Sequence, residues 1–244
     1  MDRSDIGTSL PGHPLFRVGV FTLSYLLFAT GYALDRGNTE FLFYCGVMVL
    51  LIVATALAHR HFSFSRGLLW ALSIWGALHM AGGLVTIPDD WPAAGEFRVL
   101  YSWWILPGRD VDGQPGGWLK YDQVVHAYGF GISTWLCWQI LRGALESRMA
   151  CTGRNQRIEP TAALMFLVAA AGMGLGALNE VVEFIATRIT VTNVGGYENT
   201  GWDLVANLVG ATTAALILYR TERSPSRTNR TGEVAPAAHG PSRR

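Results

Sequence analysis

Charged residues are scarce in this sequence. Only 15% of its 244 residues are Asp, Glu, Lys or Arg, whereas about 25% is usual in a soluble domain. At the same time, 50% of the residues are hydrophobic. This combination argues against a soluble globular domain and favours a chain that lies largely within a membrane.

Cysteines are few, and the common ligand-binding motifs are missing. The three cysteines, Cys45, Cys137 and Cys151, have no CxxC spacing, and two lie in apolar runs where a reduced, packed thiol is expected. The chain has no glycine-rich nucleotide loop and no stripe of basic residues. We therefore expect no nucleic-acid partner.

Long apolar runs, in contrast, are plentiful. A helix needs roughly 20 mostly apolar residues to cross the hydrocarbon core of a bilayer. Six segments meet or approach this length, which predicts an all-α, polytopic membrane protein with a single six-span domain over residues 1–219. Residues 220–244 are rich in Arg, Ser, Thr, Pro and Ala and are expected to form a disordered, basic cytoplasmic tail. The predicted spans are residues 15–34, 41–58, 67–87, 121–141, 161–187 and 203–219.

The positive charges are distributed unequally between the two sides of these spans. The side that holds both termini receives 14 of the 19 Lys and Arg residues. Because cytoplasmic loops hold the excess of positive charge, both termini are predicted to be cytoplasmic, with membrane lipids as partners. The connection over residues 88–120 then lies outside, with an interfacial belt of tryptophans and a short surface helix around residues 97–105.

Ionisable side chains occur inside the predicted spans, where each costs a few kcal/mol or more and therefore needs an explanation. Within each pair, the residues are spaced three or four apart and share one helix face. At about 1.5 Å rise per residue, the polar groups of four helices lie roughly 6–12 Å below the outer surface. The residues are His79, Asp122 with His126, Glu180 with Glu183, and Asp203 with the neutral Asn207.

Some of these residues also have simpler explanations. Asp122 and Asp203 stand at predicted helix starts, where a carboxylate can cap the exposed N–H groups. His79 alone would more often be a hydrogen-bonded packing residue than a ligand. Glu180 and Glu183 are harder to explain in this way, because two carboxylates on one face repel unless a proton, a cation or an arginine lies between them.

Taken together, two imidazoles and four carboxylates suffice to bind a divalent metal ion, with zinc, manganese or iron suited to the nitrogen and oxygen donors. A two-metal site and a metal-free, proton-sharing network remain alternatives. The predicted general base is Glu180 or Glu183. The predicted metal ligands are His79, Asp122, His126, Glu180, Glu183 and Asp203.

The same residues carry a resemblance to a known family. In their order and spacing they resemble the YjdF-like bacterial inner-membrane proteins from roughly the third span to the sixth, although Leu84 stands where many members have a second histidine. The Asp-x-x-x-His and Asp-x-x-x-Asn elements also resemble the VanZ-like proteins, which are linked to glycopeptide tolerance. The resemblance implies a location in a bacterial inner membrane and the polar positions of the site, and it implies no particular activity. The matching segments begin at His79, Tyr121, Ala177 and Asp203.

Three functions are compatible with this pattern. The first is a metal-dependent hydrolase or transferase that acts on a lipid or a lipid-linked substrate, because the cluster is predicted at the depth of the outer leaflet. The second is a structural or accessory protein in which the cluster locks the helices together. The third is a small proton-coupled transporter, since intramembrane carboxylates often mark ion routes.

Overall fold

A computed structural model describes residues 14–95, 98–109, 113, 115–154, 156–189 and 196–223. These residues form six long helices, one short 3-10 helix (η1) and one antiparallel β-hairpin. The predicted fold class, an all-α membrane protein, is confirmed, and the short β-hairpin is the one addition to it among these residues. The long helices are α1 (Pro14–Asp35), α2 (Thr39–Phe62), α3 (Arg66–Leu84), α4 (Tyr121–Cys151), α5 (Ala162–Ile189) and α6 (Tyr197–Thr221). The remaining elements are η1 (Leu100–Ser102), β1 (Trp104–Arg109) and β2 (Pro115–Lys120).

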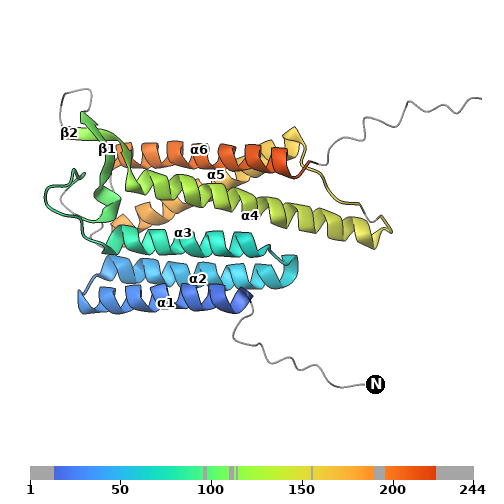
Figure 1. The fold of residues 1–244 in the computed structure, drawn as a ribbon, viewed down its shortest axis with the longest axis horizontal. Helices are drawn as coiled ribbons and strands as arrows, with labels where there is room; N and C mark the ends of the chain where they lie inside the picture. The colour runs from blue at the N-terminus through green and yellow to red at the C-terminus, as the bar shows by residue number, and fades with distance from the viewer. Residues whose placement is uncertain are drawn as a thin grey trace, which may run out of the picture.

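The helices run alternately up and down the long axis of the molecule (Figure 1). The start of α1 and the end of α6 lie at one end of the bundle, and the hairpin lies at the other (Figure 1). Both described ends of the chain are thus on one side, as an even number of crossings requires. The sequence-based prediction that the remaining tail is disordered concerns residues 224–244, which lie outside the described residues.

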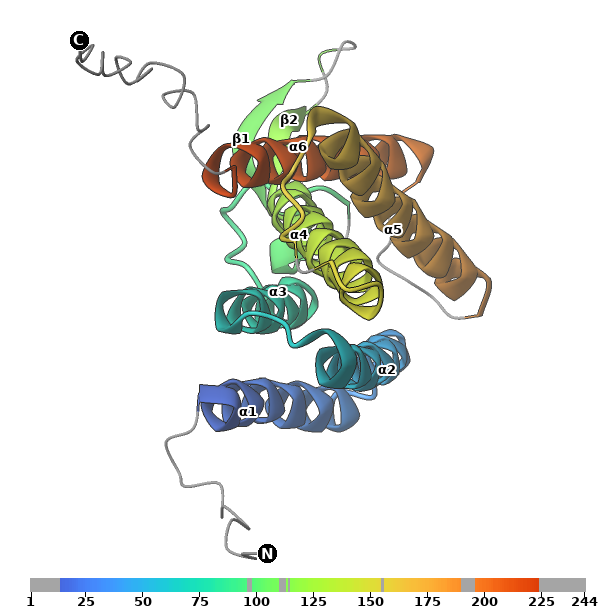
Figure 2. The same ribbon diagram turned by 90° about the vertical axis from the view of Figure 1, so that its right-hand side faces the viewer.

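Five of the described helices are long and apolar enough to cross a membrane: α1, α2, α3, α5 and α6. Helix α4 is the longest, with 31 residues, but it is more polar than the others. Seen along the bundle, it lies between α3 on one side and the pair α5 and α6 on the other (Figure 2). This position explains how α4 keeps polar residues such as Gln123, His126 and Gln139 buried among its neighbours.

Helices α4 and α6 pack backbone to backbone where they cross. A Cβ atom added at Gly210 would lie 1.9 Å from the carbonyl oxygen of Ala127, so no larger residue fits at this point. Small residues allow such close approach of helices in membranes. Gly176 on α5 similarly leaves room for the side chain of Asn207 on α6. These contacts fix the three helices that carry the polar cluster.

The structure corrects several predicted boundaries. Helix α3 ends at Leu84 rather than at residue 87, because Thr86 forms an isolated bridge with Val99. Helix α6 begins at Tyr197, six residues before the predicted start at residue 203. Asp203 therefore lies in the second turn of α6, and the helix-capping explanation for this residue is wrong.

The outer connection also differs from the prediction. A surface helix was expected around residues 97–105, yet of the described residues there, 98–105, only those of η1 are helical, and Trp104 already begins β1. The strands pair from Trp104 with Lys120 to Arg109 with Pro115. Because β2 ends directly where α4 begins, the hairpin places Lys120 above the first turn of α4.

Candidate metal centre

His126 lies at the centre of the acidic cluster. Its Nε2 atom is 3.6 Å from Oδ1 of Asp122 and 4.0 Å from Oε1 of Glu183. Its Nδ1 atom is 3.6 Å from Oε1 of Glu180 and 3.1 Å from Oδ1 of Asn207. One imidazole on α4 is thus surrounded by oxygen atoms from α4, α5 and α6.

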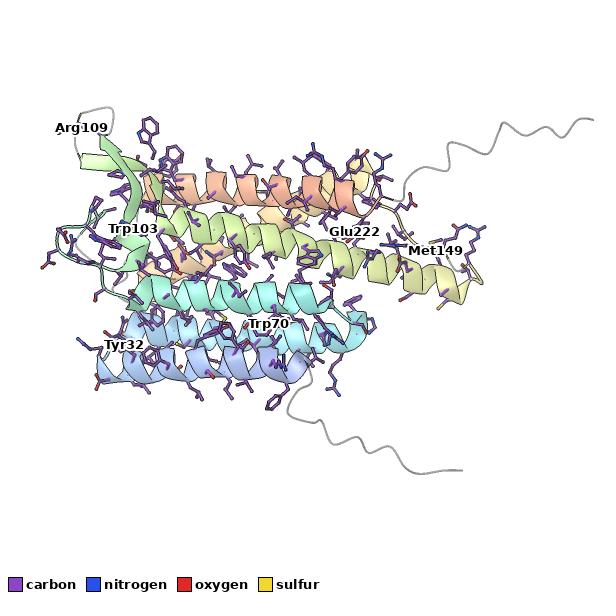
Figure 3. All side chains as sticks on the ribbon, in the orientation of Figure 1. Tyr32, Trp70, Trp103, Arg109, Met149 and Glu222 are labelled. Atoms are coloured by element: carbon purple, nitrogen blue, oxygen red, sulfur yellow. The ribbon has the colours of Figure 1, made fainter. Side chains whose placement is uncertain are left out.

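These contacts follow from helix spacing. Asp122 and His126 are four residues apart on α4, so both project from the same face toward α5 and α6. Glu180 and Glu183, three residues apart on α5, present their carboxylates to that face in the same way. The starts of α4 and α6 lie at the hairpin end of the bundle, near Trp103 in Figure 3 and away from Glu222 at the opposite end.

Two overlapping groups of side chains have the separations of metal ligands. Asp122, His126 and Asp203 form one group, and His126, Glu180 and Glu183 form the other; in each, the ligand atoms lie within 4.8 Å of one another. Zinc binds nitrogen and oxygen ligands at about 2.0–2.2 Å, so atoms around one ion lie roughly 3–4 Å apart. The limit of 4.8 Å exceeds this spacing, so an ion would have to draw the side chains of either group closer together.

Three buried polar atoms in the cluster have no hydrogen-bond partner among the described residues: Oε1 of Glu180, Oδ1 of Asp203 and Nδ2 of Asn207. Glu180 is 8% exposed, and Asp203 and Asn207 are fully buried. Buried polar groups in native proteins are nearly always paired, because an unpaired one loses its hydration without compensation. The two carboxylate oxygens are acceptors, which a proton, a water or a cation satisfies, whereas Nδ2 of Asn207 is a donor and needs an acceptor such as water.

The carboxylates have polar neighbours that the sequence analysis missed. Nδ2 of Asn179 donates a hydrogen bond of 2.7 Å to Oε1 of Glu183, and Nδ2 of Asn199 donates one of 2.6 Å to Oδ2 of Asp203. In both pairs the asparagine stands four residues before the acid, a spacing that could have revealed them. Lys120 also belongs to the site, since its Nζ is 3.9 Å from Oδ2 of Asp122 and donates a hydrogen bond to Oδ1 of Asn199.

His79 is not part of either ligand group. It stands on α3, where its Nδ1 is 2.5 Å from the hydroxyl of Tyr101, which also donates to the His79 carbonyl oxygen at 3.0 Å. Burial, and then the negative charges of Asp122 and Glu183, raise the pKa of Tyr101 well above its ordinary value, so the hydroxyl stays protonated. His79 thus anchors the outer connection to α3.

A second polar cluster holds the opposite end of α4. Oε2 of Glu222 is 2.5 Å from Nη1 of Arg142 and accepts a hydrogen bond of 2.9 Å from Nε1 of Trp138. Arg157 approaches the same oxygen at 3.9 Å. Glu222 follows directly after α6, so these contacts join the end of α6 to α4. The sequence analysis did not identify this cluster.

Comparison with known proteins gives one match. Residues 17–224 match the family described as "Predicted membrane protein (DUF2238)". The chain belongs to this family. No curated protein and no solved structure matches the chain. Membership in the DUF2238 family agrees with the apolar helices found here and covers all six of them almost completely. The family description names a membrane location and no activity.

Proposed function

We propose that the chain is a metal-dependent membrane hydrolase or transferase that acts on a lipid or lipid-linked substrate in the outer leaflet. The observation that supports it best is the pair of carboxylate oxygens without a hydrogen bond, Oε1 of Glu180 and Oδ1 of Asp203, beside His126. A divalent cation would pair with the two carboxylate oxygens and reduce the repulsion between the acids. Zinc, manganese and iron suit this donor set.

The proposed ligands are Asp122, His126, Glu180 and Asp203, and Glu183 acts as the general base. Glu183 suits this role because Asn179 fixes one of its oxygens while its side chain remains 14% exposed. A bound cation would supply an activated water or a polarised substrate oxygen. We leave His79 out of the ligand set, because its Nδ1 contacts Tyr101.

We further propose that the bundle lies in a bacterial inner membrane with both termini in the cytoplasm. The excess of Lys and Arg at one end of the bundle supports this orientation, and the resemblance to YjdF-like proteins supports the location. The hairpin and the cluster then lie at the outer leaflet, where lipid-linked substrates can reach them from the membrane.

The transporter reading has less support. A conducting or carrying route would need polar groups that continue below the cluster, toward the other end of α4. The next buried side chains of α4 in that direction are the apolar Phe130 and Trp138 and the hydroxyls of Ser133 and Thr134, of which the Thr134 hydroxyl donates to the backbone oxygen of Phe130 at 2.7 Å. Gly172 on α5 lies so close to Thr134 that an added Cβ would be 2.0 Å from its hydroxyl oxygen. Packing of this kind favours a closed site over a path.

An accessory role without metal has one observation in its favour. Lys120, Asn179 and Asn199 already supply hydrogen bonds or positive charge to Asp122, Glu183 and Asp203. In that case His126 would hold the carboxylates together through its two ring nitrogens, which lie 3.6 Å from Asp122 and from Glu180. Metal analysis separates the two functions directly.

The test is elemental analysis of the purified protein, with the affinity tag removed, after exposure to zinc, manganese or iron and then desalting. We expect close to one equivalent of one metal per chain in the wild type and less than a tenth in Glu180→Ala and His126→Ala. Glu146→Ala, which removes a carboxylate near the other end of α4, is the control and should retain the metal. A wild-type protein without metal under all three conditions would refute the proposal.

A further inference from the structure

An apolar groove lies on the outer surface of the contact between α4 and α6. Its volume is about 400 Å³, and its lining includes Trp118, Val124, Ala127, Trp202, Val205 and Val209. It starts at the hairpin and extends to Tyr128, seven residues into α4, which is about 10 Å along the helix axis. The groove therefore covers about two thirds of the roughly 15 Å hydrocarbon depth of one leaflet.

Lys120 directly follows Trp118 and Leu119, which line the groove at its hairpin end. A lysine near the membrane surface normally extends its ammonium group into water, but the side chain of Lys120 is only 10% exposed and turns inward. Its Nζ is bonded to Asn199 and lies 5.8 Å from the centre of the Trp104 ring. The protein thus keeps a positive charge beside the acidic cluster rather than in solvent.

The groove and the lysine are connected through one residue. The backbone N–H of Lys120 donates a hydrogen bond of 2.8 Å to Oε1 of Gln123, and Gln123 lines the groove. On α6, Trp202 lines the groove while its neighbour Asp203 belongs to the metal cluster. The residues of the groove, Lys120 and the candidate metal site are therefore neighbours along the starts of α4 and α6.

We infer that this groove binds an acyl chain of a phosphate-bearing lipid and that Lys120 binds the phosphate of its head group. In a membrane, the surface that carries the groove faces lipid acyl chains. The ammonium group of Lys120 supplies the positive charge that selects an anionic head group over a neutral one. The inference rests on the proposed function in one respect: it takes this lipid to be the substrate of the proposed enzyme. Lipid binding itself needs no metal.

Cation binding in the cluster would also release Lys120. Without a cation, the ammonium group offsets the negative charge of Asp122 at 3.9 Å. A divalent ion shared by Asp122 and its neighbours takes over this role, and Lys120 can then turn to a phosphate oxygen. Metal and phosphate are thus expected to bind with positive cooperativity.

The experiment measures binding of short-chain lipids to the detergent-purified full chain by calorimetry. The probes are dioctanoyl phosphatidate, dioctanoylglycerol, which lacks the phosphate, and inorganic phosphate. We expect phosphatidate to bind about tenfold more tightly than either of the other probes. Dioctanoylglycerol lacks the phosphate that would bond to Lys120, and inorganic phosphate lacks the acyl chains that would fill the groove. Lys120→Gln should remove the preference for phosphatidate, and Lys120→Arg should largely keep it.

A groove-filling variant tests the position of the chain. Val205→Trp should weaken phosphatidate binding about tenfold, whereas Leu208→Trp, an equally exposed position of α6 outside the groove, should leave it unchanged. Equal binding of phosphatidate and dioctanoylglycerol would overturn the role of Lys120, and inorganic phosphate binding as tightly as phosphatidate would overturn the role of the groove. A change of oligomeric state in Val205→Trp with unchanged lipid binding would assign the groove to a second copy of the chain.

Repeating the titration in the presence of EDTA separates this inference from the proposed function. Selective phosphatidate binding in a protein that never binds metal would sustain the lipid site and refute the metal enzyme. A metal-loaded protein without lipid selectivity would sustain the metal site and refute the lipid site.

Discussion

The imidazole of His126 on α4 and the amide of Asn207 on α6 form a hydrogen bond, with 3.1 Å between Nδ1 and Oδ1. A neutral histidine that donates from Nδ1 has its lone pair on Nε2. Nε2 is the atom that faces Asp122 and Glu183. Asn207 therefore orients His126 as a ligand, in the way that residues behind metal ligands commonly do.

Replacing Asn207 should weaken metal binding without removing a ligand. We expect Asn207→Ala to lower the affinity for the cation about 10- to 100-fold, because the imidazole loses the contact that fixes its tautomer and orientation. A competition titration with a chromophoric chelator measures this change. Gln139→Ala removes a buried amide at the other end of α4, where it bonds to Ser65, and serves as the control with unchanged affinity.

The histidine on α3 should be dispensable for metal binding. His79→Ala is expected to keep the full metal content, because the Nδ1 atom of His79 contacts the hydroxyl of Tyr101 rather than a carboxylate. Tyr101→Phe should lower the free energy of unfolding by about 1 kcal/mol through the same lost contact. Loss of metal in His79→Ala would instead restore this residue to the ligand set.

The close crossing of α4 and α6 should tolerate no side chain at Gly210. We expect Gly210→Ala to destabilise the protein by about 1–3 kcal/mol, because the added Cβ meets the backbone of Ala127. Gly201→Ala in the same helix has open space around the new Cβ and should not destabilise it. Thermal unfolding in detergent compares the two, and equal melting temperatures would contradict the close packing.

The ion pair at the opposite end should support the fold and not the site. Glu222→Gln is expected to lower the free energy of unfolding by about 1–2 kcal/mol, since Arg142 loses a charged partner in a partly exposed place. The metal content of this variant should equal that of the wild type. A variant that loses metal while remaining folded would show that the two ends of α4 are coupled.

Labelling of cysteines tests the orientation of the bundle. In a variant that retains only the exposed Cys151, a membrane-impermeant maleimide added to intact cells should not react. A single cysteine at Leu106→Cys, on the exposed hairpin, should react under the same conditions. The reverse pattern would place the hairpin and the candidate metal centre in the cytoplasm.

The sequence was sufficient to predict the helices, because long apolar runs have few other stable structures in a membrane. The sequence also indicated that five ionisable residues share one depth, and the structure brings their side chains together. These residues are Asp122, His126, Glu180, Glu183 and Asp203. Depth alone does not fix how a helix is rotated about its axis. For this reason His79 was assigned to the cluster, although its contacts on α3 are with Tyr101.

Other features could not be derived from apolar patterning. The first turns of α6 contain Glu198, Asn199 and Thr200, whose polarity hid the true start of the helix. The hairpin strands contain prolines and glycines rather than alternating apolar residues, so they gave no strand signal. Lys120 looked like an ordinary surface charge, and its inward position depends on the pairing of the hairpin with α4.

The central claim is that one imidazole and several carboxylates hold a divalent cation near the hairpin end of the bundle. X-ray absorption at the metal edge of the loaded protein tests it most directly. We predict a shell of nitrogen and oxygen atoms only, at about 2.0–2.2 Å, with the outer-shell signal of a single imidazole, which disappears in His126→Ala. A sulfur ligand, the signal of two imidazoles, or an unchanged spectrum in His126→Ala would contradict the account.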